Sequence, residues 1–328
     1  MNNSTAACKS GGRRGFWVIA GVIMCAEISI AAIEVAASPL CVSERMAGSL
    51  SARQGEVVMV KVPEADREAA MSGTFMGRAV PFFVDTRPQR PGGYAGLLGI
   101  DVQDPPGAQR LTIIVKGNGR ERCLQVFVTV IKGDFPVQRL TLPREKVDLD
   151  EKSVVRWKEE QRAVTFALAR DFPKLLWERP FGEPVQGPRT GAFGSVRIMN
   201  GQPRAPHNGI DIAAPLGTDV AASSDGVVRL AVDHLLSGKG VYLDHGFGLY
   251  TMYFHLSEVL VRDGDSVKAG QIIGRVGATG RASGPHLHWG ARLNGARVDP
   301  ESLLAVPYRR KAAPTEAQHD AIPSGRGN

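Results

Sequence analysis

The chain has 328 residues but few cysteines and no Cys-x-x-Cys pair: its four are Cys8, Cys25, Cys41 and Cys123. Without that spacing, the cysteines do not form the motif of a structural zinc site. Cys8 and Cys25 fall in an N-terminal segment with the features of a targeting signal. Cys41 and Cys123 flank the first predicted domain and could form one disulfide in an oxidising compartment, the alternative being two buried thiols.

The N-terminal segment also lacks a long uncharged apolar run. Its apolar stretch, Phe16 to Ala26, ends at a glutamate and is far shorter than the roughly 20 residues that cross a bilayer. Two arginines before this stretch and the small residues Val35-Ala36-Ala37 after it form the pattern of an export signal. We expect residues 1–37 to be a signal peptide, which places the protein in the periplasm or cell envelope. The alternative is an uncleaved signal-anchor that holds the chain on the inner membrane through residues 16–36.

Histidine is absent from residues 54–132, so this part of the chain offers no histidine ligand for a metal. It consists instead of β-branched and aromatic runs separated by Pro-Gly, Gly-Gly and Pro-Pro-Gly turns, which predicts short strands. The predicted strands are residues 57–62, 79–84, 94–100, 111–115 and 124–130. We therefore expect residues 38–133 to form a small antiparallel β-sandwich that serves for packing, docking or inhibition rather than catalysis.

A linker is expected over residues 134–184, with one helix near 148–170. Asp148 or Asp150 can cap the start of this helix, and Pro173 ends it. Apolar residues along it are expected to pack against a domain, among them Val155, Trp157, Val164 and Phe166. The proline-rich segment that follows, with Trp177 and Phe181, suits an extended stretch along the surface of the next domain.

Residues 185–305 alternate strand-like runs with glycine-rich turns, which predicts a second β domain. Its predicted strands are residues 220–222, 226–231, 240–245, 250–255, 271–276 and 286–290. The polar tail at residues 306–328 is expected to be disordered. The formal charge of +7 favours acidic surroundings such as nucleic acid, anionic lipid or wall polymers, but ordinary solubility explains it equally well.

The second domain carries a candidate metal centre. His286 and His288 are two apart in a predicted strand, so their side chains point to the same face. His207 and Asp211 are four apart, and the Asn-Gly between them favours a turn that brings them together. Two histidines and an aspartate suit a catalytic zinc, which takes three protein ligands and keeps one position for water. A fourth candidate beside the metal could act as a general base or donor.

The chain resembles the lysostaphin-type (LytM) zinc peptidases that cut peptide bonds in bacterial cell walls. The resemblance runs from about residue 181 to residue 304. It is carried by Phe193-Gly194, the His-x-x-x-Asp at His207 and Asp211, Pro215-Leu216-Gly217-Thr218, Tyr253-Phe254-His255-Leu256, the run from Gly264 to Gln271, Gly277-Ala278-Thr279-Gly280 and Gly284-Pro285-His286-Leu287-His288. Residues 38–133 are similar to a domain that precedes the peptidase in some exported members.

This resemblance implies an all-β peptidase domain of the duplicated hybrid type over residues 185–305, and a mainly β fold for the whole chain. It also implies that His207, Asp211 and His288 bind one zinc ion per catalytic domain, and that His255 and His286 are the catalytic pair.

The implied function is that of an exported zinc endopeptidase that hydrolyses stem peptides or cross-links of peptidoglycan. Peptidoglycan is then the expected partner, and a regulatory protein is a possible second one. Nucleic acid is not expected as a partner, and membrane contact is expected only through an uncleaved N-terminal segment. The alternative is a non-catalytic protein that binds the wall or activates a separate amidase. Such relatives have usually lost a metal ligand, whereas this chain keeps all three.

Overall fold

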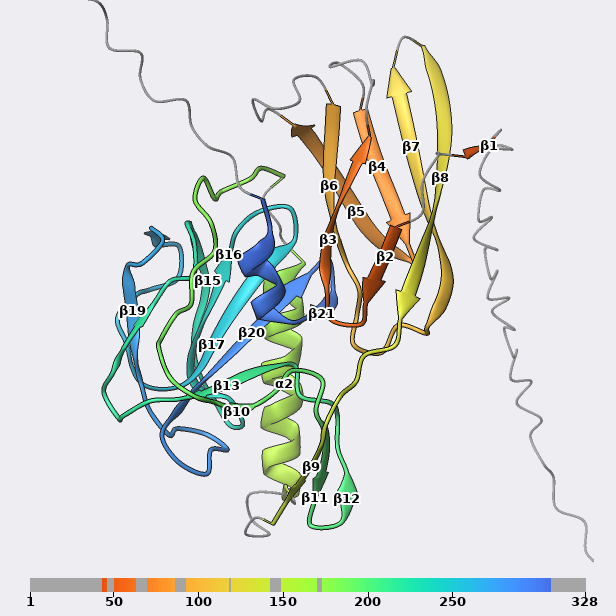
Figure 1. Cartoon of the computed structure of the whole chain (residues 1–328). Coiled ribbons are helices and arrows are strands. Elements are labelled where there is room, and N and C mark those ends of the chain that lie inside the picture. The colour runs from red at the N-terminus through yellow and green to blue at the C-terminus, as the bar shows by residue number, and fades with distance from the viewer. Residues whose placement is uncertain are drawn as a thin grey trace, which may run out of the picture. The chain divides into compact units, whose positions relative to one another are not determined.

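The computed structural model describes residues 43–45, 50–62, 70–85, 93–117, 119–141, 149–169 and 173–307 (Figure 1). All of them belong to one compact unit, Cys41–Asn328. The predicted export segment at 1–37, Cys41 and the tail from 308 lie outside the described residues. No helix in the described ranges is both long and apolar enough to cross a membrane.

The N-terminal part is an eight-stranded β-sheet structure. Its strands are β1 (Ser43–Arg45), β2 (Leu50–Arg53), β3 (Val57–Val62), β4 (Ala70–Phe75), β5 (Arg78–Asp85), β6 (Gly93–Gly99), β7 (Gly107–Gly117) and β8 (Arg120–Ile131). The order is β1-β8-β7-β4-β5-β6-β3, with β2 also paired to β8. All five predicted strands are present, and most pairs are antiparallel, but β1 and β2 run parallel to β8.

This part has its own apolar core, which alternate residues of the strands supply. In β7, Leu111 and Ile113 are fully buried while Thr112 between them is more exposed, as a period of two requires. Cys123 on β8 is buried and disulfide-bonded. Cys41 lies outside the described residues, so its pairing with Cys123 stays a prediction.

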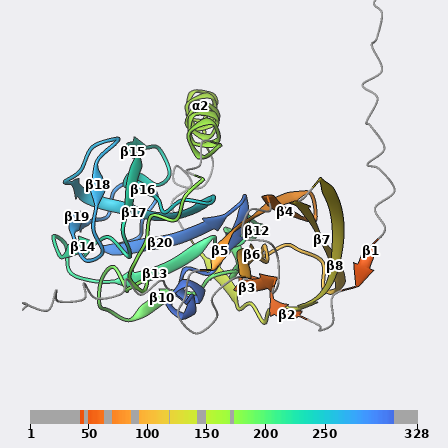
Figure 2. The ribbon, with the colours of Figure 1, turned by 90° about the horizontal axis from the view of Figure 1, so that it is seen from above.

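The predicted helix is present as α2 (Glu151–Leu168). The Asp150 side chain caps it by accepting a hydrogen bond from the Ser153 N–H at 2.7 Å. Val164 packs on the sheet, whereas the side chains of Val155 and Phe166 are largely exposed, so the prediction that Val155 packs against a domain is wrong. At 100° per residue these two positions lie on the helix face opposite Val164. Figure 2 shows α2 lying over one side of β15, β16 and β17.

The C-terminal part is built on a ten-stranded sheet. Its main path is β10 (Arg189–Gly191), β13 (Gly209–Ala213), β20 (His286–Leu293), β17 (Leu249–Val259), β16 (Gly238–Asp244), β15 (Gly226–His234) and β18 (Ser266–Val267). Off this path lie β14 (Asp219–Ala221), β19 (Ile272–Val276) and β21 (Ala296–Val298), and the 3-10 helix η1 (Pro300–Ala305) follows. The six predicted strands are all present, and the fold is mainly β as predicted.

The linker makes more contacts than predicted. Its strand β9 (Val137–Leu140) joins β11 (Val196–Met199) and β12 (Gln202–Pro203) in a small sheet, pairing in parallel with β11. Trp177 and Phe181 are not on a surface but buried, in a cluster that includes Leu97 of the N-terminal sheet and Leu293 of β20. The linker therefore helps to pack the N-terminal sheet against the C-terminal domain.

Candidate metal centre

Three neighbouring strands bring the predicted site residues together. In the antiparallel register Asp211 of β13 lies opposite His288 of β20, and Phe254 of β17 lies opposite His288 on its other side. His207 precedes β13 and is almost completely buried. The Asn-Gly between His207 and Asp211 is not a turn, because Gly209 already belongs to β13. A glycine is required at position 209 because the strand β20 comes so close that no side chain fits. A Cβ there would lie 2.4 Å from the Trp289 carbonyl oxygen and 2.7 Å from Nε2 of His288.

His207, Asp211 and His288 form a buried cluster with three converging donor atoms. Nε2 of His207 lies 3.0 Å from Oδ1 of Asp211 and 2.9 Å from Nδ1 of His288. Nδ1 of His288 lies 2.9 Å from the same Oδ1. The sequence prediction that these three side chains share one site therefore agrees with their placement.

The tautomer of His207 shows that this cluster fits a cation. Its Nδ1 lies 3.0 Å from the carbonyl oxygen of Ala192, which can only accept, so Nδ1 carries the proton and Nε2 has a free lone pair. That lone pair faces a carboxylate oxygen and the ring nitrogen of His288. Such lone pairs repel one another unless a proton or cation lies between them. Two imidazoles and one carboxylate are a donor set that zinc accepts, and a backbone carbonyl that orients a ligating histidine is typical of such sites.

Asp211 is held in its ionised form. Burial alone would raise the pKa of its carboxyl, but the close contacts with His207 and His288 outweigh burial and hold the pKa well below its usual range. Its second oxygen, Oδ2, accepts a hydrogen bond from Nη2 of Arg197 at 2.8 Å. Burial also lowers the pKa of His288, to about 4, which favours the neutral imidazole that binds metals.

His255 reaches the site through a β-bulge in β17. Regular alternation would place it on the same face as Tyr253, which is fully buried in the core. Between the pairs Lys239–Leu256 and Val241–Tyr253, β17 has one more residue than β16. His255 has a φ of 63°, a left-handed conformation that is rare for a residue with a side chain and common at functional sites. The bulge and this backbone conformation, not regular alternation, therefore turn His255 toward the pocket.

His255 and His286 lie beside each other, with ring centroids 4.8 Å apart. Nδ1 of His255 lies 2.8 Å from the carbonyl oxygen of Thr279, and Nδ1 of His286 lies 2.8 Å from that of Gly284. Each Nδ1 therefore carries a proton, and each Nε2 is available for proton transfer. Nε2 of His286 is 3.9 Å from Oδ1 of Asp211. Burial lowers the pKa of His255 to about 3, helped by the nearby His288, so the ring is neutral at pH 7.

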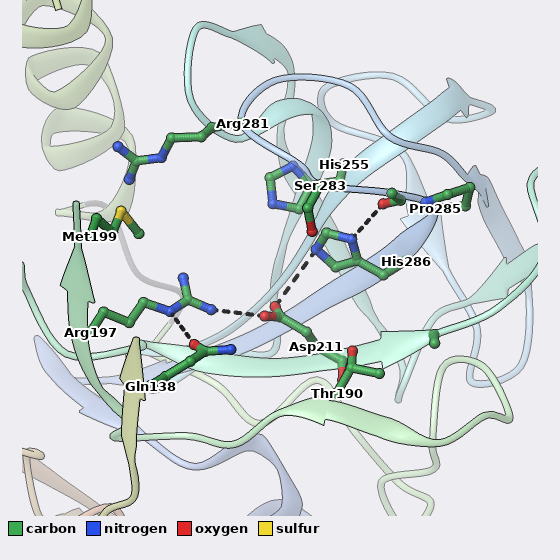
Figure 3. A pocket seen from close by; sticks show the side chains of 12 residues that line it. Gln138, Thr190, Arg197, Met199, Asp211, His255, Arg281, Ser283, Pro285 and His286 are labelled. Atoms are coloured by element: carbon green, nitrogen blue, oxygen red, sulfur yellow. Dashed lines mark hydrogen bonds and ion pairs between the residues drawn. The ribbon is translucent and has the colours of Figure 1, made fainter. Parts of the chain in front are cut away.

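Asp211, His255 and His286 line a pocket of about 300 Å³ (Figure 3). Sequence reasoning found its Asp211, His255 and His286 but missed its other polar residues, Gln138, Thr190, Arg197, Arg281 and Ser283. Gln138 comes from β9 in the linker and accepts a hydrogen bond from Nε of Arg197 at 3.1 Å. Nothing in the sequence around Gln138, Thr190 or Arg197 marks them. Arg281 and Ser283 do stand beside motifs of the family resemblance, since Arg281 directly follows Gly277-Ala278-Thr279-Gly280 and Ser283 directly precedes Gly284-Pro285-His286.

A mainly β chain with a buried His-Asp-His cluster and two further histidines beside a pocket has the architecture of a metallopeptidase. Residues 205–300 match peptidase family M23. A Pseudomonas aeruginosa protein of known structure, assigned to the M23 peptidases, is 31% identical and has a TM-score of 0.60. The match covers 76% of this chain and 94% of that protein. The chain belongs to peptidase family M23, which confirms the resemblance to lysostaphin-type enzymes.

Two curated relatives each match about a third of this chain. Peptidoglycan DD-endopeptidase ShyA of Vibrio cholerae is 47% identical over 113 residues, which are 33% of this chain and 26% of ShyA. DD-carboxypeptidase/endopeptidase Mpg of Neisseria meningitidis is 48% identical over 101 residues, which are 31% of this chain and 23% of Mpg. The match thus spans about a quarter of the length of these relatives.

Proposed function

We propose that the chain is a zinc-dependent endopeptidase that hydrolyses stem peptides or cross-links of bacterial peptidoglycan. The observation that carries this proposal is the complete set of five polar side chains: His207, Asp211 and His288 within 3.0 Å of one another, and His255 and His286 beside them. The names of the two curated relatives, both endopeptidases and one of them a peptidoglycan enzyme, support the substrate class.

His207, Asp211 and His288 would hold one zinc ion. When bound, zinc acts as a Lewis acid that polarises a carbonyl and makes water a stronger acid. The chain's own residues then have two tasks. His255 and His286, with their Nδ1 protons fixed by backbone carbonyls, present Nε2 atoms to the pocket, where one accepts the proton of the attacking water. The proton taken from the water then passes to the departing amine, and the other histidine, when a second proton occupies its Nε2, donates a hydrogen bond to the oxyanion.

We also propose that the protein acts in the periplasm or cell envelope, where its substrate lies. Residues 1–37, predicted to direct export or to anchor the chain in the inner membrane, lie outside the described residues. A regulatory protein partner likewise stays a prediction.

Zinc content and release of muropeptides from purified wall material test the proposal. The chain without residues 1–37 is compared with His207→Ala and His255→Ala, and with His234→Ala on β15 as the control. We expect about one zinc per wild-type chain, loss of zinc and activity in His207→Ala, and loss of activity with zinc retained in His255→Ala. A zinc-loaded wild type that releases nothing from several wall types would instead favour the wall-binding or amidase-activating alternative.

A further inference from the structure

Arg281 is a cation in the pocket, and the part of the chain that the structure describes pairs it with no carboxylate. It lies between β19 and β20, and its side chain lines the pocket. Figure 3 shows Arg281, Met199 and Arg197 along one side, with His255 and His286 across from them. Within the described residues no ion pair of Arg281 with an acidic group is found, whereas Arg275 and Arg297 each pair with a carboxylate.

Other cations surround Arg281. Burial and the charges of Arg197 and Arg204 lower the pKa of its guanidinium, which means that its positive charge is less well solvated than in water. The acidic residue that lines the same pocket, Asp211, is already bonded to Arg197 and to the histidines. An anion that entered the pocket would therefore gain a favourable interaction with Arg281.

The backbone at Arg281 is held by contacts with a neighbouring loop. Its N–H donates to the carbonyl oxygen of Leu236 at 2.8 Å. The preceding Gly280 has a φ of 68°, and a Cβ there would lie 2.3 Å from the backbone N of Gly238, so the two loops are in close contact. A side chain on a fixed backbone loses less entropy when it binds a ligand, which suits recognition of a substrate group.

We propose that Arg281 binds a carboxylate of the substrate next to the scissile peptide bond. A guanidinium matches a carboxylate in shape and can form two parallel hydrogen bonds with it. Figure 3 shows the Arg281 side chain on the side of the pocket across from His255 and His286, so a carboxylate bound by Arg281 would be a neighbour of the reacting carbonyl and not part of it. Ser283 and Gln138, which also line the pocket, add uncharged polar groups.

This inference rests on the proposed function and narrows its substrate class. Stem peptides of peptidoglycan carry free carboxylates along their length, whereas a bridge made of glycine carries none within the chain. Arg281 therefore favours cleavage in or beside an acidic stem peptide over cleavage within a neutral bridge.

The test uses two cross-linked peptides that differ in one group beside the scissile bond, a carboxylate in one and a carboxamide in the other. We expect the wild type to cleave the carboxylate peptide with at least a tenfold higher kcat/KM, because a buried charged partner typically contributes that much or more. Arg281→Ala should lose this preference, with little change for the carboxamide peptide and with unchanged zinc content. Arg281→Lys should keep part of it, and Arg275→Ala, at an exposed pair on β19, should keep all of it.

The inference is overturned if Arg281→Ala shows the same preference as the wild type, or if the wild type cleaves both peptides equally well.

A measurement of peptide binding distinguishes failure of this inference from failure of the proposed function. Titration calorimetry of both peptides with His255→Ala, and with His255→Ala/Arg281→Ala, measures recognition without cleavage. If the wild type cleaves neither peptide, the proposed function fails. The carboxylate subsite still stands if binding of the carboxylate peptide depends on Arg281, and falls if it does not.

Discussion

Arg197 and Asp211 are joined by a hydrogen bond of 2.8 Å from Nη2 to Oδ2, which leaves Oδ1 directed at the two histidines of the cluster. Arg197 is itself oriented by Gln138, a residue of the linker strand β9. The linker thus contributes to the orientation of a candidate metal ligand that lies more than seventy residues away in the sequence.

We predict that Arg197→Ala weakens zinc binding by about 10- to 100-fold, the usual effect of losing a group that orients a metal ligand. Without Arg197, Oδ2 of Asp211 loses its charged donor and the carboxylate can rotate away from the histidines. Competition with a chelator of known affinity measures the change. Gln138→Ala is the matched control, because it removes only the contact to Arg197 and should cost less. Equal zinc affinity in the wild type and Arg197→Ala would show that the histidines alone orient Asp211.

We predict that Gly209→Ala disrupts the metal centre more than the fold. The added methyl group would meet the Trp289 carbonyl oxygen at 2.4 Å and Nε2 of His288 at 2.7 Å, so His288 must move. Loss of zinc with retained β-sheet circular dichroism is the expected result. Gly182→Ala is the control, because the nearest atom to its Cβ lies 3.9 Å away and its zinc content should not change.

Eleven strands could be predicted from the sequence because they combine β-branched or aromatic residues with glycine or proline nearby. Ten others in the described residues were missed, most of them short, and one of these is β13, which carries Asp211. β4 was missed because Ala70–Phe75 contains no β-branched residue except Thr74 and no apolar alternation. The prediction that His286 and His288 point to the same face of their strand followed from the period of two. Nε2 of His286 and Nδ1 of His288 both lie within 4 Å of Oδ1 of Asp211.

Other parts of the site depend on contacts that one sequence does not reveal. His255 turns toward the pocket through a bulge and a positive φ, which regular alternation does not anticipate. Arg197 acquires its role from pairing between β9 and β11, two strands separated by the whole of α2. The position of Arg281 depends on packing between its loop and the loop at Leu236. Each of these is a tertiary contact, so no local pattern encodes it.

We predict that Arg297→Ala lowers the free energy of unfolding by about 3 kcal/mol. Arg297 of β21 binds Asp101 of the N-terminal part through Nη2 at 2.6 Å and Nε at 3.0 Å. Burial would raise the pKa of Asp101, but these bonds outweigh it and lower the pKa, so the carboxylate stays charged and needs its partner. Urea unfolding measures the loss. Arg275→Ala, which breaks an exposed ion pair with Glu258, is the control and should lower the free energy of unfolding by at most about 1 kcal/mol.

The pH dependence of this effect provides a further check. Because the folded-state pKa of Asp101 is lowered, the pair stabilises the fold above the unfolded pKa of about 4 and loses this contribution as the pH falls. The difference between the wild type and Arg297→Ala should therefore shrink in acid. A difference that stays constant down to the acid transition would assign the loss to packing rather than to charge.

We predict that His245 destabilises the protein in mild acid. His245 is fully buried, and burial lowers its pKa to about 4. Its Nδ1 proton is donated to the carbonyl oxygen of Asp225 at 2.7 Å, so Nε2 accepts from the hydroxyl of Thr251 at 2.8 Å. A proton on Nε2 would break that second bond and place a charge in the core.

The sign follows from the two pKa values. The unfolded chain binds this proton below about pH 6.5 and the folded chain only below about 4, so the stability that neutral His245 confers is complete above 6.5 and is lost as the pH falls toward 4. The total loss of unfolding free energy is about 3 kcal/mol.

Urea unfolding of the zinc-free protein between pH 7 and 4.5 measures this loss, since removal of the metal excludes the pH dependence of metal binding. His245→Gln cannot take up the proton, so its stability should fall less steeply over this range even if it is lower at pH 7. An equal slope in both proteins would mean that the acid sensitivity comes from the other buried histidines, His255 and His288, whose pKa values are lowered in the same direction.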